Sequence, residues 1–312
     1  MAAMTTQATM AIATLTSILS MVDSWIAFAQ VSPASEKSYR KGIRRLAEYC
    51  RANSISAPSR ADMLAYRAYL QEKYSPATVN LYLTAAKLFF SWLNVEGEII
   101  FNPTVRIKGV KIRAGHRKDA LSTEQVKKIF SNFDVSTLKG KRDKAMFALM
   151  VTAGLRTIEI SRANVSDIIE REGKYFLLVQ GKGHSEKDAE VRIADGVFVL
   201  IKSYLESRGE ISADSSLFAS CSNRNFGGRM ITNSISCIVK DAMRRAGFDS
   251  KRLTAHSLRH TAATTALKAG ATMREVQQVL RHTNISITQI YLHDMDRLNN
   301  NAECLAAAAF GF

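Results

Sequence analysis

The chain has 312 residues, of which 46% are hydrophobic and 23% are charged, and this balance excludes an intrinsically disordered protein. Lysine and arginine number 43 against 28 aspartate and glutamate residues, which gives a formal net charge of +15. Such a charge favours polyanionic partners, nucleic acid above all, and the length predicts two domains rather than one.

The basic excess is present in both parts of the chain. Residues 1–115 contain 14 basic and 7 acidic residues, and the remainder contains 29 and 21. A clamp that holds a DNA duplex from two sides fits this distribution better than a globular head with one basic tail. The four cysteines are widely spaced with no C-x-x-C pair, which predicts reduced thiols in a cytosolic protein.

The first hundred residues are typical of helices. The apolar run MAIATLTSILSMVDSWIAFAQ, residues 10–30, is interrupted by Asp23 and follows no basic residue, so it predicts a first helix rather than a signal peptide. Residues 32–53, 59–74 and 75–97 predict three further helices, each entered through a serine.

These helices carry candidate DNA contacts. Arg40, Arg44 and Lys87 would supply a basic surface, although solvated helix faces of proteins that bind no DNA carry such residues equally often. A basic connector then follows, in which Lys108 and Lys111 are candidate phosphate contacts and no acidic residue occurs before Asp119.

The second domain is predicted to begin near the capping box formed by Ser122 and Gln125. Residues 174–180 and 189–194 are the only convincing strands, and the glycine-containing segment between them predicts a hairpin. Further helices are predicted for residues 197–209, 230–248, 256–271 and 272–282. The expected fold class is therefore mainly α, with a helical N-terminal domain and a mixed α+β C-terminal domain that contains a small antiparallel sheet.

Histidine and arginine gather in the motif HSLRH. Helical spacing places His256, Arg259 and His260 on neighbouring positions of one side. A zinc site is one interpretation, but the chain has no H-E-x-x-H motif and arginine is unfavourable beside a cation. An anion site fits better, because a guanidinium group binds phosphate oxygens with a rigid fork.

Three other positions carry side chains that could take part in catalysis, but their local sequence pattern does not decide whether they do. Arg156 precedes Glu159 by three residues, which by itself predicts an ordinary helix ion pair. Lys182 lies between two glycines in the predicted hairpin, where the loop could approach a ligand closely. Tyr291, on a short helix predicted from the capping pattern at residues 286–289, would alone be a half-buried tyrosine.

Taken in order, these motifs resemble the tyrosine recombinase (phage integrase) family, in the simple two-domain form of Xer-like recombinases and mobile-element integrases. The block HSLRHTAATTALKAGATMREVQQVLRHTNISITQIYLH is similar to the C-terminal signature of that family, and the resemblance spans most of residues 20–295. The catalytic residues that it implies are Arg156, Lys182, His256, Arg259, His282 and Tyr291, with Glu159 and His260 as supporting residues. His293 has no implied role.

The resemblance implies a site-specific DNA recombinase that cuts and rejoins duplex DNA through a 3′-phosphotyrosyl intermediate and a Holliday junction. Tyr291 would be the nucleophile, the two arginines would bind the non-bridging phosphate oxygens, and Lys182 would protonate the leaving 5′ oxygen. His256 would assist proton transfer, and His282 would donate a hydrogen bond to the phosphate. DNA integration or excision, inversion and chromosome-dimer resolution all remain open as the biological task.

One residue departs from the family pattern. The family usually has glycine immediately before the histidine that matches His282, whereas this chain has Arg281, which could add a DNA phosphate contact. The domains expected from the resemblance are a DNA core-binding domain, a basic linker, a catalytic domain and a tail that docks either on its own domain or on a neighbouring protomer. The core-binding domain is expected at residues 1–105, the linker at 106–119, the catalytic domain at 120–297 and the tail at 298–312.

The resemblance also implies the partners of the protein. It predicts binding to double-stranded DNA with a specific recombination site, a homotetramer on DNA that forms from monomers or weak oligomers, and room for an accessory DNA-bending protein. No cofactor, metal or membrane is expected, and the location is the bacterial cytoplasm with the nucleoid. The alternatives are a type IB topoisomerase-like enzyme that nicks and reseals DNA, and a non-catalytic DNA-binding regulator.

Overall fold

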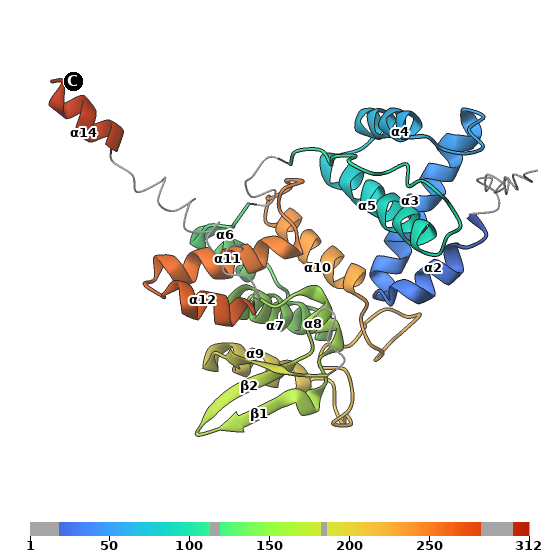
Figure 1. The fold of residues 1–312 in the computed structure, drawn as a ribbon. Coiled ribbons are helices and arrows are strands. Elements are labelled where there is room, and N and C mark those ends of the chain that lie inside the picture. The colour runs from blue at the N-terminus through green and yellow to red at the C-terminus, as the bar shows by residue number, and fades with distance from the viewer. Residues whose placement is uncertain (1–18, 113–118, 182–185, 282–301, 312) are drawn as a thin grey trace, which may run out of the picture. The chain divides into compact units, whose positions relative to one another are not determined.

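The computed structural model describes residues 19–112, 119–181, 186–281 and 302–311, which belong to two compact units (Figure 1). The N-terminal unit comprises residues 1–114 and the C-terminal unit residues 115–312. Each unit has its own hydrophobic core, so each satisfies the main requirement for independent stability. No helix in the described ranges is both long enough and apolar enough to cross a membrane.

The described helices of the N-terminal unit are α2 (Val22–Ala29), α3 (Pro33–Ala52), α4 (Arg60–Lys73) and α5 (Pro76–Val95). Serine begins the last three, as the sequence predicts. The Ser32 hydroxyl accepts a hydrogen bond from the Ser35 amide, and Ser59 and Asp62 form a reciprocal capping box. Proline occupies the first position of α3 and of α5, where no amide hydrogen is needed.

Helix α3 packs closely along α5. A Cβ atom placed on Gly42 of α3 would lie 2.9 Å from the Cβ of Ala85, so glycine permits this approach of the two backbones. The core around this contact is rich in aromatic rings, and the rings of Trp25 and Phe89 have centroids 5.2 Å apart. Because these large apolar side chains leave water together, burial is the main stabilising contribution in this unit.

The first part of the basic connector belongs structurally to the N-terminal unit. Ile107 is buried in its core, and Asn80 of α5 exchanges two hydrogen bonds with the backbone of Val110, of 2.6 and 2.9 Å. Lys108 and Lys111 flank this attachment and are exposed. The segment that carries these two lysines is therefore fixed to α5 through residue 110.

The C-terminal unit combines helices with one small sheet. Its elements are α6 (Thr123–Ser131), α7 (Leu138–Ala153), α8 (Thr157–Arg162), η1 (Val165–Asp167), β1 (Ile168–Arg171), β2 (Lys174–Val179), β3 (Ala189–Ile193), α9 (Asp195–Glu206), α10 (Thr232–Arg245), α11 (Ala255–Lys268), α12 (Met273–Leu280) and α14 (Ala302–Ala309). Ser122 and Gln125 form the predicted capping box at the start of α6.

The sheet has the order β1-β2-β3 with antiparallel pairing throughout, so the predicted fold class is confirmed. The prediction of only two strands was wrong, because β1 also pairs with β2, with Ile168 opposite Leu177. Strand β1 is four residues long, and its burial pattern, two half-buried residues followed by two exposed ones, does not alternate. The local sequence therefore carried too little of the two-residue period to identify it.

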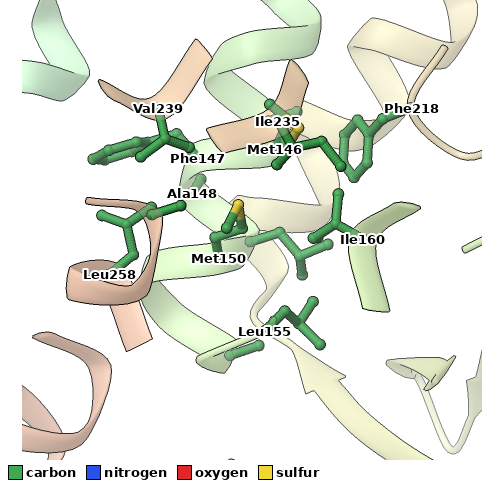
Figure 2. Close-up of a cluster of buried hydrophobic side chains, with 14 of the residues drawn as sticks. Met146, Phe147, Ala148, Met150, Leu155, Ile160, Phe218, Ile235, Val239 and Leu258 are labelled. Carbon is green, nitrogen blue, oxygen red and sulfur yellow. The ribbon is translucent and has the colours of Figure 1, made fainter. Parts of the chain in front are cut away.

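Helix α7 is the centre of the C-terminal core. Its residues 145–150 are all buried, and neighbours pack against it from α6, α9, α10, α11 and β3. Figure 2 shows Met146, Phe147 and Met150 of α7 surrounded by side chains from other segments, including Val239 of α10 and Leu258 of α11. The second half of α7 is apolar on most sides and is enclosed on most sides, so the turn that follows it at Gly154 is fixed in position.

Candidate functional site

Arg156 is positioned by the turn that follows α7. Gly154 adopts a left-handed conformation with φ +60° and ψ 31°, which ends the helix and redirects the chain into α8. Arg156 is the residue before α8, and its amide donates a hydrogen bond of 2.7 Å to Glu159 Oε2. Its guanidinium lies 2.8 Å from Glu159 Oε1, so the ion pair predicted from the spacing is present.

Arg259 comes from the first half of α11 and is almost completely enclosed, with 1% of its surface exposed. Its Nη1 atom donates a hydrogen bond of 2.6 Å to the carbonyl of Gly154, and its Nη2 atom donates to the carbonyl of Leu280 at the end of α12. Two backbone carbonyls from different segments thus hold this guanidinium, which limits its rotamer freedom strongly.

The two histidines of HSLRH have different surroundings in the structure. His256, in the first turn of α11, is exposed and lines the same cleft as Arg156 and Arg259. His260 is 5% exposed and does not line that cleft. Hydrogen bonds from Arg252 lower the pKa of the Asp119 carboxyl, and the charge of His260 adds a smaller effect in the same direction. His260 is therefore buried outside the cleft lining, and its supporting role stays a prediction.

The arginine cleft, defined by Arg156, His256 and Arg259, has a volume of about 720 Å³. It is also lined by three basic residues that the sequence prediction missed, Lys240, Arg244 and Lys251. The spacing of the first two, four residues apart on α10, was an available signal for a basic helix face. Lys240 and Arg244 are paired with Asp249, and Asp241 also lines the cleft, but the basic residues of the lining outnumber this one carboxylate, so the cleft is suited to a polyanion.

The N-terminus of α11 adds to this electropositive environment. Thr254, Ala255 and His256 line the cleft, so the positive end of the dipole of a 14-residue helix lies at its wall. The first-turn amides of a helix stabilise anions in the same way as they stabilise capping carboxylates. Among the described residues, no three His, Cys, Asp or Glu side chains are grouped as metal ligands.

Arg281 lies directly after α12 and reaches the same carboxylate as Arg156. Its Nη2 atom is 2.7 Å from Glu159 Oε2, and the two side chains are 12% and 0% exposed. Burial raises the pKa of Glu159, but the charge of Arg281 and the hydrogen bonds from Arg156 outweigh burial and leave that pKa lower than usual. Glu159 is therefore an ionised, buried carboxylate between two guanidinium groups. The DNA contact considered for Arg281 stays a prediction.

Three implied catalytic residues lie outside the described residues, namely Lys182, His282 and Tyr291, and so does His293. The capping box expected at residues 286–289 lies there as well. The structure thus brings together Arg156, His256 and Arg259 from the implied set, and Glu159 contacts Arg156.

The candidate DNA contacts of the N-terminal unit have different surroundings. Arg40 is paired with Glu36 at 2.8 Å and with Asp23 at 2.5 Å, whereas Arg44 is exposed and Lys87 is half-buried. Lys108 and Lys111 are exposed, as described above. The role of each in DNA binding stays a prediction.

Comparison with known proteins gives matches along both units. Residues 119–297 match the phage integrase family, and residues 18–96 match the N-terminal SAM-like domain of phage integrases. The chain is 32% identical over 246 residues to tyrosine recombinase XerC of Herpetosiphon aurantiacus, with 77% of each chain covered.

Two solved structures share the fold. The XerH site-specific recombinase bound to palindromic difH substrate in a post-cleavage complex gives a TM-score of 0.74 at 21% identity, covering 92% of this chain and 83% of that one. A lambda integrase tetramer bound to a Holliday junction gives a TM-score of 0.66 at 19% identity, with 87% and 78% covered.

Proposed function

The chain belongs to the phage integrase family, and on this premise we propose how its residues carry out the reaction of a site-specific tyrosine recombinase. Members of this family are DNA strand-transferring enzymes, and site-specific recombination is the function of this chain. The observation that carries the residue assignment is the convergence of Arg156, from the turn before α8, with His256 and Arg259 of α11 on one basic cleft.

The arginine cleft would bind the scissile phosphate. The two guanidinium groups would bind its non-bridging oxygens and stabilise the additional negative charge of the pentacovalent transition state. Arg259 is fixed by two carbonyls and Arg156 by Glu159, so little reorganisation would be needed as that charge develops. His256, exposed at the N-terminus of α11, would move protons at the reacting oxygens.

The strand exchange would proceed by two transesterifications. The Tyr291 hydroxyl gives its proton to His256 as its oxygen attacks the phosphorus atom, the bond from phosphorus to the 5′ oxygen breaks, and Lys182 gives that oxygen a proton. A 3′-phosphotyrosyl bond conserves the energy of the phosphodiester, so a 5′-hydroxyl of the partner duplex can reverse the reaction. His282 would donate a hydrogen bond to the phosphate in both steps. These three roles rest on the match of the sequence to the family.

The proposed partners follow from the same reaction. A duplex carrying a specific site is the substrate, and one round of exchange between two duplexes requires four protomers, the assembly in which lambda integrase binds a Holliday junction. An accessory DNA-bending protein is compatible with this scheme. The site of action would be the nucleoid in the bacterial cytoplasm, where the recombining DNA is located.

The C-terminal tail is a candidate link between protomers. Leu305 and Phe310, in and directly after α14, are 70% and 76% exposed, which supports a docking partner for this short apolar helix. We infer that the partner is a neighbouring protomer on DNA. A chain truncated after Asn301 should bind single sites but lose the tetrameric complex in gel filtration, and an unchanged tetramer would contradict this exchange.

The decisive experiment detects the covalent intermediate. A duplex selected by the protein from a randomised library would be nicked near the cleavage position, so that the cut fragment diffuses away, and incubated with protein in EDTA. We expect a covalent protein–DNA band on a denaturing gel, and Tyr291→Phe should abolish it. Tyr66→Phe is the matched control, because that buried hydroxyl has no hydrogen-bond partner among the described residues.

The two alternatives give other results in this assay. A non-catalytic regulator would form no adduct, and an adduct that survives Tyr291→Phe would refute the assignment of the nucleophile. A type IB topoisomerase-like enzyme would form the adduct but relax supercoiled DNA without a Holliday junction product. The family match and the Xer relative favour recombination over both.

A further inference from the structure

The end of α12 helps to hold both arginines of the cleft in position. The carbonyl of Leu280 accepts a hydrogen bond from Nη2 of Arg259. The next residue, Arg281, places its guanidinium 2.7 Å from Oε2 of Glu159, whose other oxygen is 2.8 Å from Nη1 of Arg156. Leu280 thus contacts Arg259 directly, and Arg281 contacts Arg156 through the carboxylate of Glu159. These two consecutive residues immediately precede His282.

The backbone at Arg281 favours a different residue. Its φ of +53° and ψ of 47° lie in the left-handed region, which glycine adopts readily and which is unfavourable for a side chain with a Cβ atom. Arginine at this position therefore carries a conformational cost that a side-chain contact must offset. Its side chain contacts the fully enclosed carboxylate of Glu159 and the carbonyl of Val279, and the first of these is the ion pair.

We propose that Arg281 is a positioning residue for strand cleavage, which fixes the carboxylate of Glu159 and through it the guanidinium of Arg156 in the arginine cleft. The proposal rests on the recombinase function proposed above. Arg156 is 30% exposed at its side chain, so it depends on Glu159 for its orientation more than the enclosed Arg259 does. A loosened carboxylate would let Arg156 leave the orientation that a phosphate needs.

A direct phosphate contact by Arg281 is the competing role, and the geometry disfavours it. Its side chain is 12% exposed and is absent from the lining of the arginine cleft. Its Nη1 atom donates a hydrogen bond of 2.5 Å to the carbonyl of Val279, and Nη2 is directed to the carboxylate. Arg259 is enclosed and held as well, but it lines the arginine cleft, whereas Arg281 does not, so Arg281 is placed to act on Glu159 rather than on DNA.

The test is a double-mutant cycle of Arg281→Gly and Glu159→Gln in the nicked-duplex assay. Arg281→Gly suits the left-handed backbone, so the variant should fold. It should lower the single-turnover rate of adduct formation at saturating DNA by about ten- to a hundredfold, with affinity for DNA nearly unchanged. In the Glu159→Gln background the same substitution should have little further effect, because the carboxylate through which it acts is gone.

Two further variants complete the design. Arg281→Lys keeps a charge near Glu159 and should recover part of the lost rate, whereas Arg274→Ala removes an exposed arginine of α12 and should leave the rate unchanged. Arg281→Asn, which tolerates the left-handed backbone, replaces Arg281→Gly if circular dichroism shows that the glycine variant is unfolded.

The outcomes separate the possible roles. Additive losses for Arg281→Gly and Glu159→Gln would overturn the proposal, because Arg281 would then act independently of the carboxylate. A second outcome would also overturn the proposal. If Arg281→Gly weakened DNA binding, reduced its salt dependence by about one counterion and left the rate at saturating DNA unchanged, Arg281 would be a phosphate contact. A wild-type protein without a Tyr291-dependent adduct would instead overturn the proposed function itself.

Discussion

The two units bury different kinds of side chain. Among the described residues of the N-terminal unit, Thr104 is the one buried polar residue outside the tyrosines, and the core consists of aliphatic and aromatic groups together with Cys50 and Met63. The C-terminal unit encloses a set of polar and charged side chains. They are Arg142, Asp143, Glu159, Asp167, Ser216, Ser257, Arg259, His260 and Thr261.

This difference separates stability from positioning. Burial of apolar surface is non-directional and stabilises a fold whatever the details of the contacts. A buried charge is costly unless it is paired and hydrogen-bonded, and replacement of such a pair by apolar groups is often neutral or stabilising. Arg259 lines the arginine cleft and Glu159 holds Arg156 there, so these enclosed charges fix a geometry rather than provide most of the stability.

The largest predicted effect concerns the aromatic core of the N-terminal unit. Phe89 is 1% exposed and packs against the rings of Trp25 and Trp92. Phe89→Ala should lower the free energy of unfolding of this unit by about 3–5 kcal/mol, because it removes the buried ring and leaves a cavity. Urea unfolding followed by tryptophan fluorescence is selective, since both tryptophans of the chain lie in this unit.

The matched control is Phe101→Ala, which removes the same side chain from a position that is 61% exposed. It should shift the fluorescence transition little. An equal loss in both variants would contradict the view that burial dominates the stability of this unit.

The second prediction concerns the buried carboxylate. Glu159→Gln should destabilise the C-terminal unit by about 2–4 kcal/mol at neutral pH, because Arg281 then stays enclosed without its counter-charge. Urea unfolding monitored by far-ultraviolet circular dichroism measures this loss. The tryptophan signal of the N-terminal unit should not change.

The pH dependence of this loss has a defined direction. The pKa of Glu159 is lowered in the folded protein, because Arg281 and the hydrogen bonds from Arg156 outweigh the opposing effect of burial. A lowered pKa contributes stability that is fully present above the unfolded value of about 4.3 and is lost as pH falls through the folded value. The difference between wild type and Glu159→Gln should therefore shrink below about pH 4. A constant difference from pH 7 to pH 3 would show that the carboxylate charge is not the cause.

Local patterns predicted the elements well in both units. Serine caps and helical periodicity depend on residues a few positions apart, so Ser32, Ser59 and Ser122 identified three helix starts correctly. The three-residue spacing also predicted the contact between Arg156 and Glu159. Strand β1 was missed because four residues without alternation carry almost no periodic signal.

Contacts across the fold were the part that the sequence could not supply. Arg281 and Glu159 are separated by 122 residues, and no local pattern relates them. Helical spacing placed His260 beside His256, but the packing of α11 buries one and exposes the other. Lys251 precedes α11 in a turn, and its place in the cleft depends on the tertiary fold. The buried polar groups of the C-terminal unit were thus least predictable.

The third prediction concerns helix caps, which should contribute equally to the free energy of unfolding in the two units. Ser59→Ala in the N-terminal unit and Ser122→Ala in the C-terminal unit should each cost about 1 kcal/mol of the free energy of unfolding. Both serines accept a hydrogen bond from the third helical residue, of 3.3 and 3.2 Å. Fluorescence reports the first change and circular dichroism the second. Serine-to-glycine controls at the same positions should lose only a few tenths as much.

The smallest prediction concerns exposed ion pairs. Glu48→Gln removes the partner of Arg45 in the N-terminal unit, and Glu190→Gln removes the partner of Arg171 on the sheet. All four side chains are at least 40% exposed, so the solvent screens the attraction and the ordering of long side chains offsets it. Neither variant should shift the urea midpoint of its unit beyond experimental error, at low or at high salt. Equal destabilisation of the C-terminal unit by Glu190→Gln and Glu159→Gln would contradict this view. An exposed carboxylate would then contribute as much stability as the enclosed one, and enclosure of charge would not distinguish the two units.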